Sequence, residues 1–480
     1  MIDRDSREYK FVPRIINPIK MKRAFFFAAD GQVRDSKKVL DEKMPWLKTE
    51  ILPHPQSVYA AASGEPSVFL FDDTGLAILD ADTLRAQRTD SILILLSFQP
   101  YIHYAPPQAA RKKYPYVAGA DLVYAVNRDT LPPEDIILPA IRTAEDLLNI
   151  NKHSSLKRFI FHIVDDEPRW FSQFLPVLYA IIGQRADIMI TRTYEESLDF
   201  LFGVKEESEI DAGSRPLPSH GDDVVCLITD IFFPKGNELQ AAAGLDLIRL
   251  VNKHFPRIPV IIASKSKEAD ELQGLGFVLP KGDPGSLEKL KEHILDVTGI
   301  GDFLLSDDNG LELRRAKNIR EMCAIVLEAE KETEEAGELR RILENYGDKD
   351  KFSTWLYMHS YRELGDKLRP RRSRGRELIT LLKRSLQVEI ARLERTPLSL
   401  EGHKIRRLSD LLTALRSLPP ETIQPYSDND ILSSWLDRRG YSELAEELRP
   451  IHGSGPGFIQ TVVEIIEKWD FAYRGPGPNR

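Results

Sequence analysis

The chain has 480 residues, of which 42% are apolar and 29% are charged, and its formal net charge at pH 7 is −8. That length exceeds one ordinary hydrophobic core and predicts two to four domains of a globular protein. The negative charge argues against nucleic-acid binding over the whole surface, and it leaves local basic clusters open.

The cysteines and the apolar runs indicate a cytoplasmic protein. Cys226 and Cys323 both lie in apolar patterns, as reduced core thiols do. The N-terminus is charged and lacks the apolar stretch of a signal peptide. Apolar runs such as "SILILLS" (91–97) are far too short to span a membrane, so we expect no membrane partner.

Residues 1–150 contain four strand-like apolar runs with polar side chains at their ends. The runs are "KRAFFFAADG" (22–31), "SVFLFDDTG" (67–75), "SILILLS" (91–97) and "GADLVYAV" (119–126). The polar residues at or just after their ends are Asp30, Asp72, Asp73, Ser97, Asn127 and Arg128. We interpret these runs as strands of a domain built like the one that follows.

From residue 158 to about 297, five strand-like runs alternate with five helical patterns. The strand-like runs are "RFIFHIV" (158–164), "ADIMITRT" (186–193), "VVCLITD" (224–230), "IPVIIAS" (258–264) and "GFVLPK" (276–281). Such alternation predicts a parallel sheet that helices cover on both faces.

In such sheets, functional side chains collect at the carboxyl ends of the strands. The first strand here ends in Asp165 and Asp166, and the third ends in Asp230. The fourth strand ends in Ser264 and the fifth in Lys281. Each of these residues alone has an ordinary structural explanation, such as an acidic loop or a surface lysine. Their joint placement predicts carboxylates, a hydroxyl and an ammonium at one edge of the sheet.

Residues 158–297 resemble the receiver domain of two-component response regulators. The resemblance rests on "VDDE" after the first strand, "LITDIFFP" with its proline four residues past the aspartate, "PVIIAS", and the lysine after the fifth strand. It implies that Asp230 is a phosphoacceptor and that Mg²⁺ is bound by Asp165, Asp166, Asp230 and the backbone carbonyl of Phe232. It further implies phosphate-contacting or switch roles for Ser264, Lys281 and Phe277.

Chemistry supports those roles. A carboxylate that attacks a phosphoryl group approaches an anion, so a metal and a lysine have to neutralise the charge. Mg²⁺ takes oxygen ligands from a few carboxylates and leaves room for phosphate oxygens. The pair Asp165 and Asp166 is therefore expected to form half of a magnesium site.

Two features depart from the receiver pattern. Pro280 precedes Lys281 where the usual order is Lys followed by Pro, and "KGNELQAAAGLDL" (235–247) is longer than the usual connection. The longer form is similar to receiver regions that precede phosphoenolpyruvate-synthase-like domains, and this similarity extends over residues 158–385. The catalytic parts of such enzymes are not seen in this sequence, so their activity is not inferred.

The receiver resemblance also shapes the interpretation of residues 1–150 as a degenerate copy. Asp30 stands alone where an acidic pair is expected, and Asn127 and Arg128 follow the last strand where a lysine is expected. Weakened metal and phosphate binding would favour a pseudo-receiver that acts through its surfaces. The expected fold is therefore α/β, with two receiver-like doubly wound five-stranded parallel sheets and a mainly α-helical C-terminal region.

The C-terminal region carries an internal repeat. A hairpin with Asn309-Gly310 at its turn and charged helices are expected in residues 300–347. Within the helical region 348–474, "DKDKFSTWLYMHSYRELGDKLRP" (348–370) matches "DNDILSSWLDRRGYSELAEELRP" (428–450). This duplication predicts two similar helical units, with tryptophan and tyrosine as core anchors or, as the alternative, as a ligand-binding surface. The expected domains are thus 1–150, 158–299, 300–347 and 348–474.

The run "KLRPRRSRGR" (367–376) is the strongest basic cluster, and its arginines are Arg369, Arg371, Arg372, Arg374 and Arg376. Such a cluster can bind phosphate or nucleic acid. Because acidic helices are adjacent, salt bridges within the chain or a solvated loop are alternatives of at least equal weight.

The receiver resemblance implies a phosphorelay response regulator that is not an enzyme. Its phosphate would come from a histidine kinase or phosphotransfer protein, and it would signal to an output protein, with homodimer formation as a further option. Two alternatives stay open: a nucleic-acid-binding regulator acting through residues 367–376, and a regulatory subunit of a phosphoenolpyruvate-synthase-like enzyme.

Overall fold

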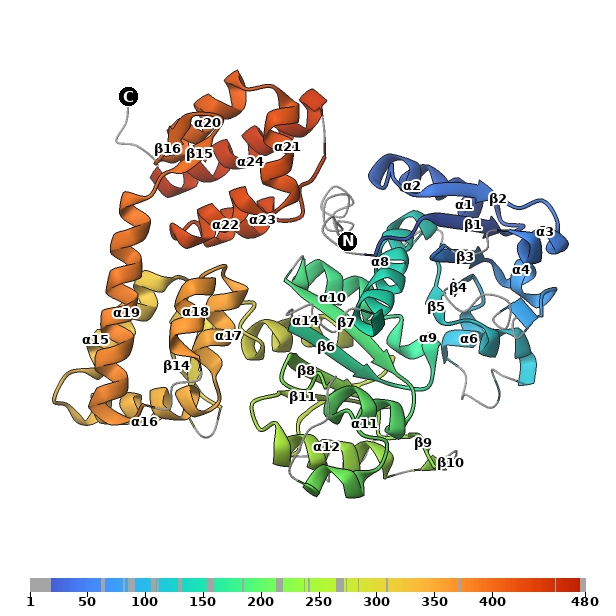
Figure 1. Cartoon of the computed structure of the whole chain (residues 1–480), viewed down its shortest axis with the longest axis horizontal. Helices are drawn as coiled ribbons and strands as arrows, with labels where there is room; N and C mark the ends of the chain where they lie inside the picture. Colours follow the sequence, from blue (N-terminus) through green and yellow to red (C-terminus); the bar gives the residue numbers. More distant parts are fainter. Residues whose placement is uncertain are drawn as a thin grey trace. The chain divides into compact units, whose positions relative to one another are not determined.

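The computed structural model divides into two compact units, Met1–Lys291 and Glu292–Arg480 (Figure 1). The residues that it describes are 19–61, 65–80, 83–84, 91–104, 109, 112–127, 132–152, 159–183, 185–212, 219–236, 238–240, 242–264, 272, 274–283, 285–307, 310–369, 373–453 and 455–474. Each unit has hydrophobic cores of its own. The finer division into four sequence segments stays a prediction.

The first sheet has five parallel strands in the order β2-β1-β3-β4-β5. They are β1 (Arg23–Phe27), β2 (Lys48–Ile51), β3 (Ser67–Phe71), β4 (Ser91–Ser97) and β5 (Leu122–Ala125). The four strands predicted from apolar runs are confirmed. The sequence analysis missed β2, because this edge strand exposes most of its side chains and so carries no apolar run.

The second sheet is parallel throughout and has the order β12-β11-β8-β6-β7. Its strands are β6 (Phe159–Val164), β7 (Ala186–Thr191), β8 (Val224–Thr229), β11 (Val260–Ser264) and β12 (Phe277–Pro280). Numbered along the chain, both sheets have the order 2-1-3-4-5, a common doubly wound order. The predicted α/β class with five-stranded parallel sheets is therefore confirmed.

Helices and short segments complete the first unit. They are α1 (Gly31–Asp35), α2 (Lys37–Lys43), α3 (Pro55–Ala60), α4 (Asp73–Ala77), α6 (Pro100–Tyr104), η2 (Pro115–Gly119), α8 (Pro133–Lys152), α9 (Pro168–Phe171), α10 (Leu175–Ile182), α11 (Tyr194–Phe202), η3 (Glu207–Ala212), the hairpin β9 (Phe233–Lys235) and β10 (Glu238–Gln240), α12 (Ala243–His254) and α14 (Ser286–Val297). Helix α14 extends across the boundary between the units.

Helix α8 joins the two sheets of the first unit, because it packs against β7 and α10 of the second sheet domain and against α1, α2 and β4 of the first. Its buried Asp146 accepts hydrogen bonds from the Tyr179 hydroxyl at 3.0 Å and from Ile188 N at 3.2 Å. A second contact links β5 to the segment after α9, where Val123 N donates to Ser172 Oγ at 3.1 Å. Buried polar groups that are hydrogen-bonded in this way fix how the two sheets pack.

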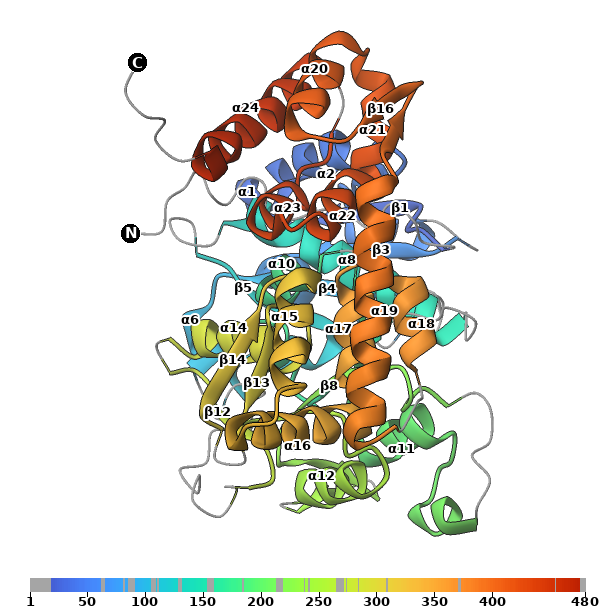
Figure 2. The same cartoon turned by 90° about the vertical axis from the view of Figure 1, so that its left-hand side faces the viewer.

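The second unit is mainly helical, as predicted. It contains the hairpin β13 (Phe303–Ser306) and β14 (Glu312–Ala316), the helices α15 (Ile319–Ala329), α16 (Glu334–Asp348), α17 (Lys351–Met358), α18 (Arg362–Leu368) and α19 (Gly375–Arg395), the hairpin β15 (Leu398–Leu400) and β16 (His403–Ile405), and the helices α20 (Leu408–Ser417), α21 (Pro420–Asp428), α22 (Ile431–Arg438), α23 (Ser442–Leu448) and α24 (Gly455–Arg474). Helix α19 runs alongside α15 (Figure 2).

The hairpin predicted in residues 300–347 is present as β13 and β14. Gly310 has a φ of +82°, the left-handed conformation that glycine adopts most readily. Asn309, the other residue predicted for this turn, lies outside the described residues.

The sequence repeat is also a structural repeat, α17–α18 and α22–α23. Each copy begins at an aspartate in the left-handed conformation, Asp350 with φ 53° and Asp430 with φ 56°. Trp355 and Trp435 are both buried, with 1% and 5% of their surfaces exposed. The prediction that these tryptophans are core anchors is confirmed by their burial.

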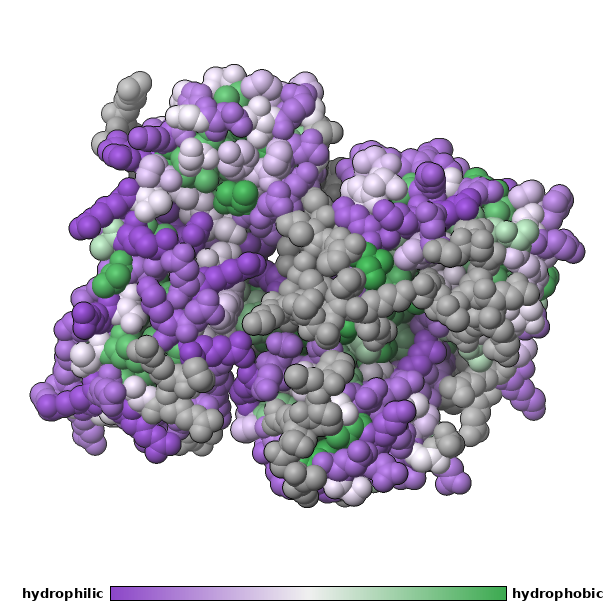
Figure 3. All heavy atoms as spheres, in the orientation of Figure 1, coloured by the Kyte–Doolittle hydropathy of each residue, from purple (hydrophilic) through white to green (hydrophobic). Residues whose placement is uncertain are grey.

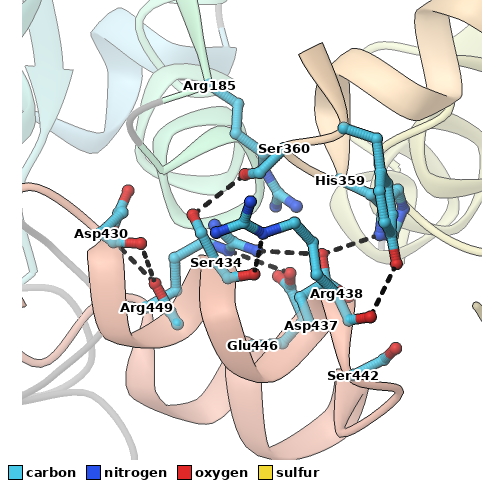
Figure 4. A network of polar contacts seen from close by, with 12 residues as sticks. Arg185, His359, Ser360, Asp430, Ser434, Asp437, Arg438, Ser442, Glu446 and Arg449 are labelled. Atoms are coloured by element: carbon cyan, nitrogen blue, oxygen red, sulfur yellow. Dashed lines mark hydrogen bonds and ion pairs between the residues drawn. The ribbon is translucent and has the colours of Figure 1, made fainter. Parts of the chain in front are cut away.

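Polar contacts join the two repeats (Figure 4). His359 Nδ1 lies 3.0 Å from Oδ2 of Asp437, and the hydroxyls of Ser360 and Ser434 lie 2.9 Å apart. The Tyr361 hydroxyl donates a hydrogen bond to the carbonyl of Arg438, at the end of α22, at 3.2 Å. The first repeat is therefore docked on α22 of the second.

The visible surfaces of both units are mostly hydrophilic, with apolar side chains in small separate patches (Figure 3). Among the described residues, no helix combines the length and apolar character needed to cross a membrane.

Candidate functional site at the carboxyl edge of the second sheet

Three charged side chains meet at the carboxyl edge of the second sheet. The Lys281 ammonium lies 2.5 Å from Oδ2 of Asp165 and 2.5 Å from Oδ2 of Asp230. Asp165 follows β6, Asp230 follows β8 and Lys281 follows β12, so three separate strands provide the cluster. The structure thus brings together three of the predicted site residues, and the inverted Pro280-Lys281 order does not keep the lysine from reaching both carboxylates.

Backbone hydrogen bonds fix the three strand ends. In each, the residue after the strand donates its N–H to the last residue of a neighbouring strand: Asp165 to Thr191 O at 3.1 Å, Asp230 to Val164 O at 2.9 Å, and Lys281 to Ser264 O at 2.9 Å. The other oxygen of each carboxylate accepts a nearby amide: Asp165 Oδ1 from Glu167 N at 2.9 Å, and Asp230 Oδ1 from Ile231 N at 2.6 Å. The two carboxylates are therefore held in place from both sides.

The cluster is buried and carries more negative than positive charge. The side chains of Asp165, Asp230 and Lys281 expose 3%, 16% and 1% of their surfaces. Burial raises the pKa of Asp165 to about 7, against the attraction of the Lys281 charge. Burial alone would lower the pKa of Lys281, but the two carboxylates outweigh it and raise that pKa above its ordinary value. With both carboxylates ionised, the single ammonium leaves one negative charge uncompensated.

Gly244, at the start of α12, lets the helix approach the Asp230 loop closely. Its N–H donates to the Ile231 carbonyl at 2.9 Å. A Cβ atom added at Gly244 would lie 2.2 Å from the Asp230 carbonyl oxygen, far inside van der Waals contact. Glycine is therefore required here for the position of Asp230.

The other predicted site residues lie around this cluster. Asp166 is half-buried in the loop after Asp165, and Ser264 is buried at the end of β11. Phe277 is half-buried at the start of β12, and the Phe232 side chain is 40% exposed. Among the described residues, no group of three or more histidine, cysteine, aspartate or glutamate side chains is arranged to hold a metal ion. The individual roles assigned to these residues stay predictions.

The carboxylates at the edge of the first sheet are engaged in local hydrogen bonds. Asp72 accepts from Gly75 N and from Asp30 N, each at 2.6 Å. Asp73 accepts from Ser97 Oγ at 2.7 Å, Phe98 N at 2.9 Å and the Tyr116 hydroxyl at 3.0 Å, while burial raises its pKa. Asn127 is exposed, and Arg128 lies outside the described residues.

Three arginines of the basic cluster form ion pairs with acidic residues of the same unit. Arg369 pairs with Asp350 at 3.0 Å, Arg374 pairs with Asp348 at 3.1 Å, and Arg376 pairs with Glu332. Arg371 and Arg372 lie outside the described residues. The predicted alternative of salt bridges within the chain therefore describes Arg369, Arg374 and Arg376.

The sequence analysis missed two buried charged residues that lie next to Asp165. Glu167 and Arg169 are buried next to Asp165, and the Arg169 Nε lies 3.1 Å from Glu167 Oε2. The only sequence signal was their place beside the acidic pair, because charged residues in a loop ordinarily indicate solvent exposure.

Comparisons with known proteins do not support the receiver identification. No protein-family model matches the sequence, and no curated protein is significantly similar to it. Several solved structures are similar in part, including the three that follow. A candidate phosphosugar isomerase from Bacillus subtilis shows 11% identity and a TM-score of 0.19, covering 54% of this chain and 84% of its own. A candidate phosphosugar isomerase from Salmonella typhimurium shows 14% identity and a TM-score of 0.18, covering 59% and 89%.

The third solved structure is the C-terminal domain of glucosamine-fructose-6-phosphate aminotransferase from Francisella tularensis. It shows 8% identity and a TM-score of 0.20, and the match covers 59% of this chain and 82% of that domain. Likenesses of this size assign no activity to the chain.

These findings correct the identification made from sequence. No family model and no curated protein supports a receiver, and the similar solved structures are isomerase and aminotransferase domains, so the identification of residues 158–297 as a receiver and of residues 1–150 as a degenerate one is withdrawn. The phosphorelay function and both of its alternatives are withdrawn, as is the expectation that the chain is not an enzyme. The physical reason for the error is that doubly wound sheets of unrelated function all collect polar residues at this edge.

Proposed function

We propose that the carboxyl edge of the second sheet binds a divalent cation together with a phosphate-bearing small molecule. One observation carries the proposal: Asp165 and Asp230 share a single buried ammonium, which leaves excess negative charge in a largely buried site. Burying a charge without a partner is energetically costly, so a carboxylate pair of this kind tends to bind a proton or a cation.

The chemistry of the donors suits Mg²⁺. This ion usually binds one or two carboxylates, keeps several waters and completes its shell with phosphate oxygens. Asp165 and Asp230 are two carboxylates on separate strand ends, close enough to contact one ammonium. Since no larger set of acidic side chains gathers in the described residues, water and ligand oxygens would fill the remaining positions. When bound, the cation would supply charge neutralisation for the phosphate group.

Lys281 gives the site its second positive charge. Once a cation neutralises the two carboxylates, the ammonium can turn part of its hydrogen-bonding capacity to an anionic ligand. Charge-assisted hydrogen bonds from lysine to phosphate are strong and common in phosphate sites. The pairing of a cation and an ammonium is therefore the feature that favours phosphate-bearing ligands over neutral ones.

A second candidate function follows from the titration of Asp165. A carboxyl group whose pKa is about 7 can accept or donate a proton near neutral pH, as general acid–base catalysis requires. Without a cation, Asp165 and Lys281 would then act as a proton-transferring pair on a bound phosphorylated compound. Chelation separates the two candidates, because only the first needs a divalent ion.

Calorimetric titration of the full chain tests the proposal. Mg²⁺ should bind the unsubstituted protein, and inorganic phosphate or glycerol 3-phosphate should bind more tightly when Mg²⁺ is present. Asp230→Asn and Asp165→Asn should each remove the Mg²⁺ signal, whereas Asp222→Asn, a largely exposed carboxylate of the same domain, should keep it. Phosphate binding that is equal with and without EDTA would contradict the cation-dependent site and favour the second candidate.

A further inference from the structure

Helix α9 connects the candidate site to the first sheet through one buried arginine. Arg169 exposes 1% of its surface. Its Nε donates to Glu167 Oε2 at 3.1 Å, and its Nη1 donates to the carbonyl of Ile102 at 2.7 Å. Ile102 belongs to α6, the helix that follows β4 of the first sheet. A single guanidinium therefore bonds to both sheet domains.

The contacts continue from Arg169 to the candidate site without a gap. Glu167 accepts from Arg169 with its carboxylate and donates its own N–H to Asp165 Oδ1 at 2.9 Å. Asp165 uses its other oxygen for Lys281 at 2.5 Å. All of these groups are buried, so each hydrogen bond holds its partners more firmly than the same bond would in water.

A second branch runs through Trp170. The guanidinium carbon of Arg169 lies 5.0 Å from the centre of the Trp170 ring, within the range of a cation–π interaction. The far edge of that ring faces Gly282, where an added Cβ would lie 3.9 Å from it. Gly282 directly follows Lys281, so Arg169 supports both the loop that carries Asp165 and the loop that carries Lys281.

The first domain reaches this region from its own carboxyl edge. Helix α6 begins three residues after Ser97, and Ser97 donates to the half-buried carboxylate of Asp73. Phe98 N donates to the same carboxylate at 2.9 Å. Residues 97 and 98, which lead to Ile102, are therefore held by hydrogen bonds to the first sheet domain, so their position does not depend on Arg169.

We infer that Arg169 is a positioning residue through which the first domain fixes the positions of the Asp165 and Lys281 loops relative to each other. Cation binding at the second sheet is therefore coupled to the packing of α6. This inference rests on the proposed function for its ligand. The coupling is reciprocal by thermodynamic linkage: a cation that orders the Asp165 loop also stabilises the contact with Ile102.

The test compares Arg169→Lys with a matched arginine. Lysine keeps the positive charge beside Glu167, but it lacks the planar fork that bonds two partners at once. The control is Arg192→Lys, because Arg192 also joins the two domains, with its Nη2 donating to the Asp121 carbonyl at 2.6 Å. The double variant Glu167→Met with Arg169→Met removes the pair together and leaves no buried charge behind.

Two measurements on the full chain decide the matter. In the first, Arg169→Lys should bind Mg²⁺ about 10- to 100-fold more weakly than the unsubstituted protein, the usual effect of losing a residue that orients a metal ligand, while Arg192→Lys should bind as before. In the second, Mg²⁺ should slow hydrogen exchange in α6 of the unsubstituted protein, and this slowing should be absent in Arg169→Lys and in the double variant. A purely structural role would not produce the second result.

Equal Mg²⁺ affinity in Arg169→Lys and the unsubstituted protein, or equal weakening in Arg192→Lys, would overturn the inference. If the unsubstituted protein binds no Mg²⁺, the proposed function fails, and hydrogen exchange of the metal-free proteins still tests the positioning role. In that case Arg169→Lys should speed exchange of the Glu167 amide, which donates to Asp165, and an unchanged rate would overturn the inference by itself.

Discussion

His359 Nδ1 lies 3.0 Å from Oδ2 of Asp437, and this buried contact joins the two helical repeats of the second unit (Figure 4). The opposite ring nitrogen, Nε2, lies 3.0 Å from the Gly301 carbonyl, which can only accept a hydrogen bond. The imidazole also stacks on Trp355, with ring centres 4.2 Å apart. One side chain thus contacts the second repeat, the segment before β13 and the core tryptophan of its own repeat.

Replacing this histidine should loosen the contact between the repeats. His359→Phe keeps the stacking on Trp355 but loses both hydrogen bonds, so we expect a loss of about 1–3 kcal/mol in the free energy of unfolding of the second unit. Urea unfolding followed by tryptophan fluorescence measures it. His403→Phe, at an exposed position of the same unit, is the control and should change stability by less than about 0.5 kcal/mol. Equal midpoints for both variants would contradict the role of His359.

Asp165 should make the metal-free protein less stable as the pH rises. Burial raises its pKa to about 7, whereas an unfolded aspartate has a pKa of about 4. Between these values the folded state holds a proton that the unfolded state has released, so the free energy of unfolding falls from pH 4 to pH 7 and this contribution is constant above that range. Asp165→Asn cannot release a proton and should flatten the slope. Thermal unfolding in EDTA across this range measures it, and parallel curves for both proteins would refute the assignment.

His162, on the strand β6 that precedes Asp165, should have the opposite effect. Burial lowers its pKa to about 3, below the ordinary value of about 6.5. The unfolded state therefore binds a proton that the folded state does not, so stability falls as the pH drops below about 6.5. His162→Gln keeps a polar group toward Thr191, whose hydroxyl lies 2.8 Å from Nε2, and should lose this acid sensitivity. His403→Gln, a change at an exposed position, should retain the acid sensitivity. If His162→Gln is as acid-sensitive as the unsubstituted protein, His162 is excluded as the cause.

Gly244→Ala should disturb the site more than the fold. The added methyl group would meet the Asp230 carbonyl, so the Asp230 loop must shift, at a cost of about 1–3 kcal/mol. Mg²⁺ binding should weaken together with stability. Gly31→Ala is the matched control, because a Cβ there meets nothing within 4 Å, and we expect unchanged stability or a gain of up to about 1 kcal/mol. Calorimetric Mg²⁺ titration and thermal unfolding check both changes, and an unaltered Mg²⁺ affinity in Gly244→Ala would show that the loop position does not control the site.

The sequence predicted the strands wherever burial on both faces required a continuous apolar run. This holds for β6, β8 and β11, whose side chains are almost entirely buried. It failed for the edge strand β2, because an edge strand pairs through its backbone and need not bury its side chains. The duplicated helical unit was equally clear, since tryptophan and aspartate recur at matching positions.

The sequence by itself also determined that Asp165, Asp230 and Lys281 would share one edge, because parallel strands place their carboxyl ends together. It did not determine the activity, and the receiver identification drawn from those same residues was wrong. Motifs at strand ends report the topology, which many families share.

Only the tertiary structure decided how the site is held and which charges are compensated. The bond from Arg169 to Ile102 spans 67 positions of the chain, and that from Lys281 to Asp165 spans 116. Sequence patterns record local periodicity and burial, whereas the first contact depends on how the two sheets pack against each other and the second on how distant strands meet within one sheet. The raised pKa of Asp165 and the partner of the buried Arg169 both follow from that packing, because they depend on the exclusion of water and on neighbours that lie far away in the sequence.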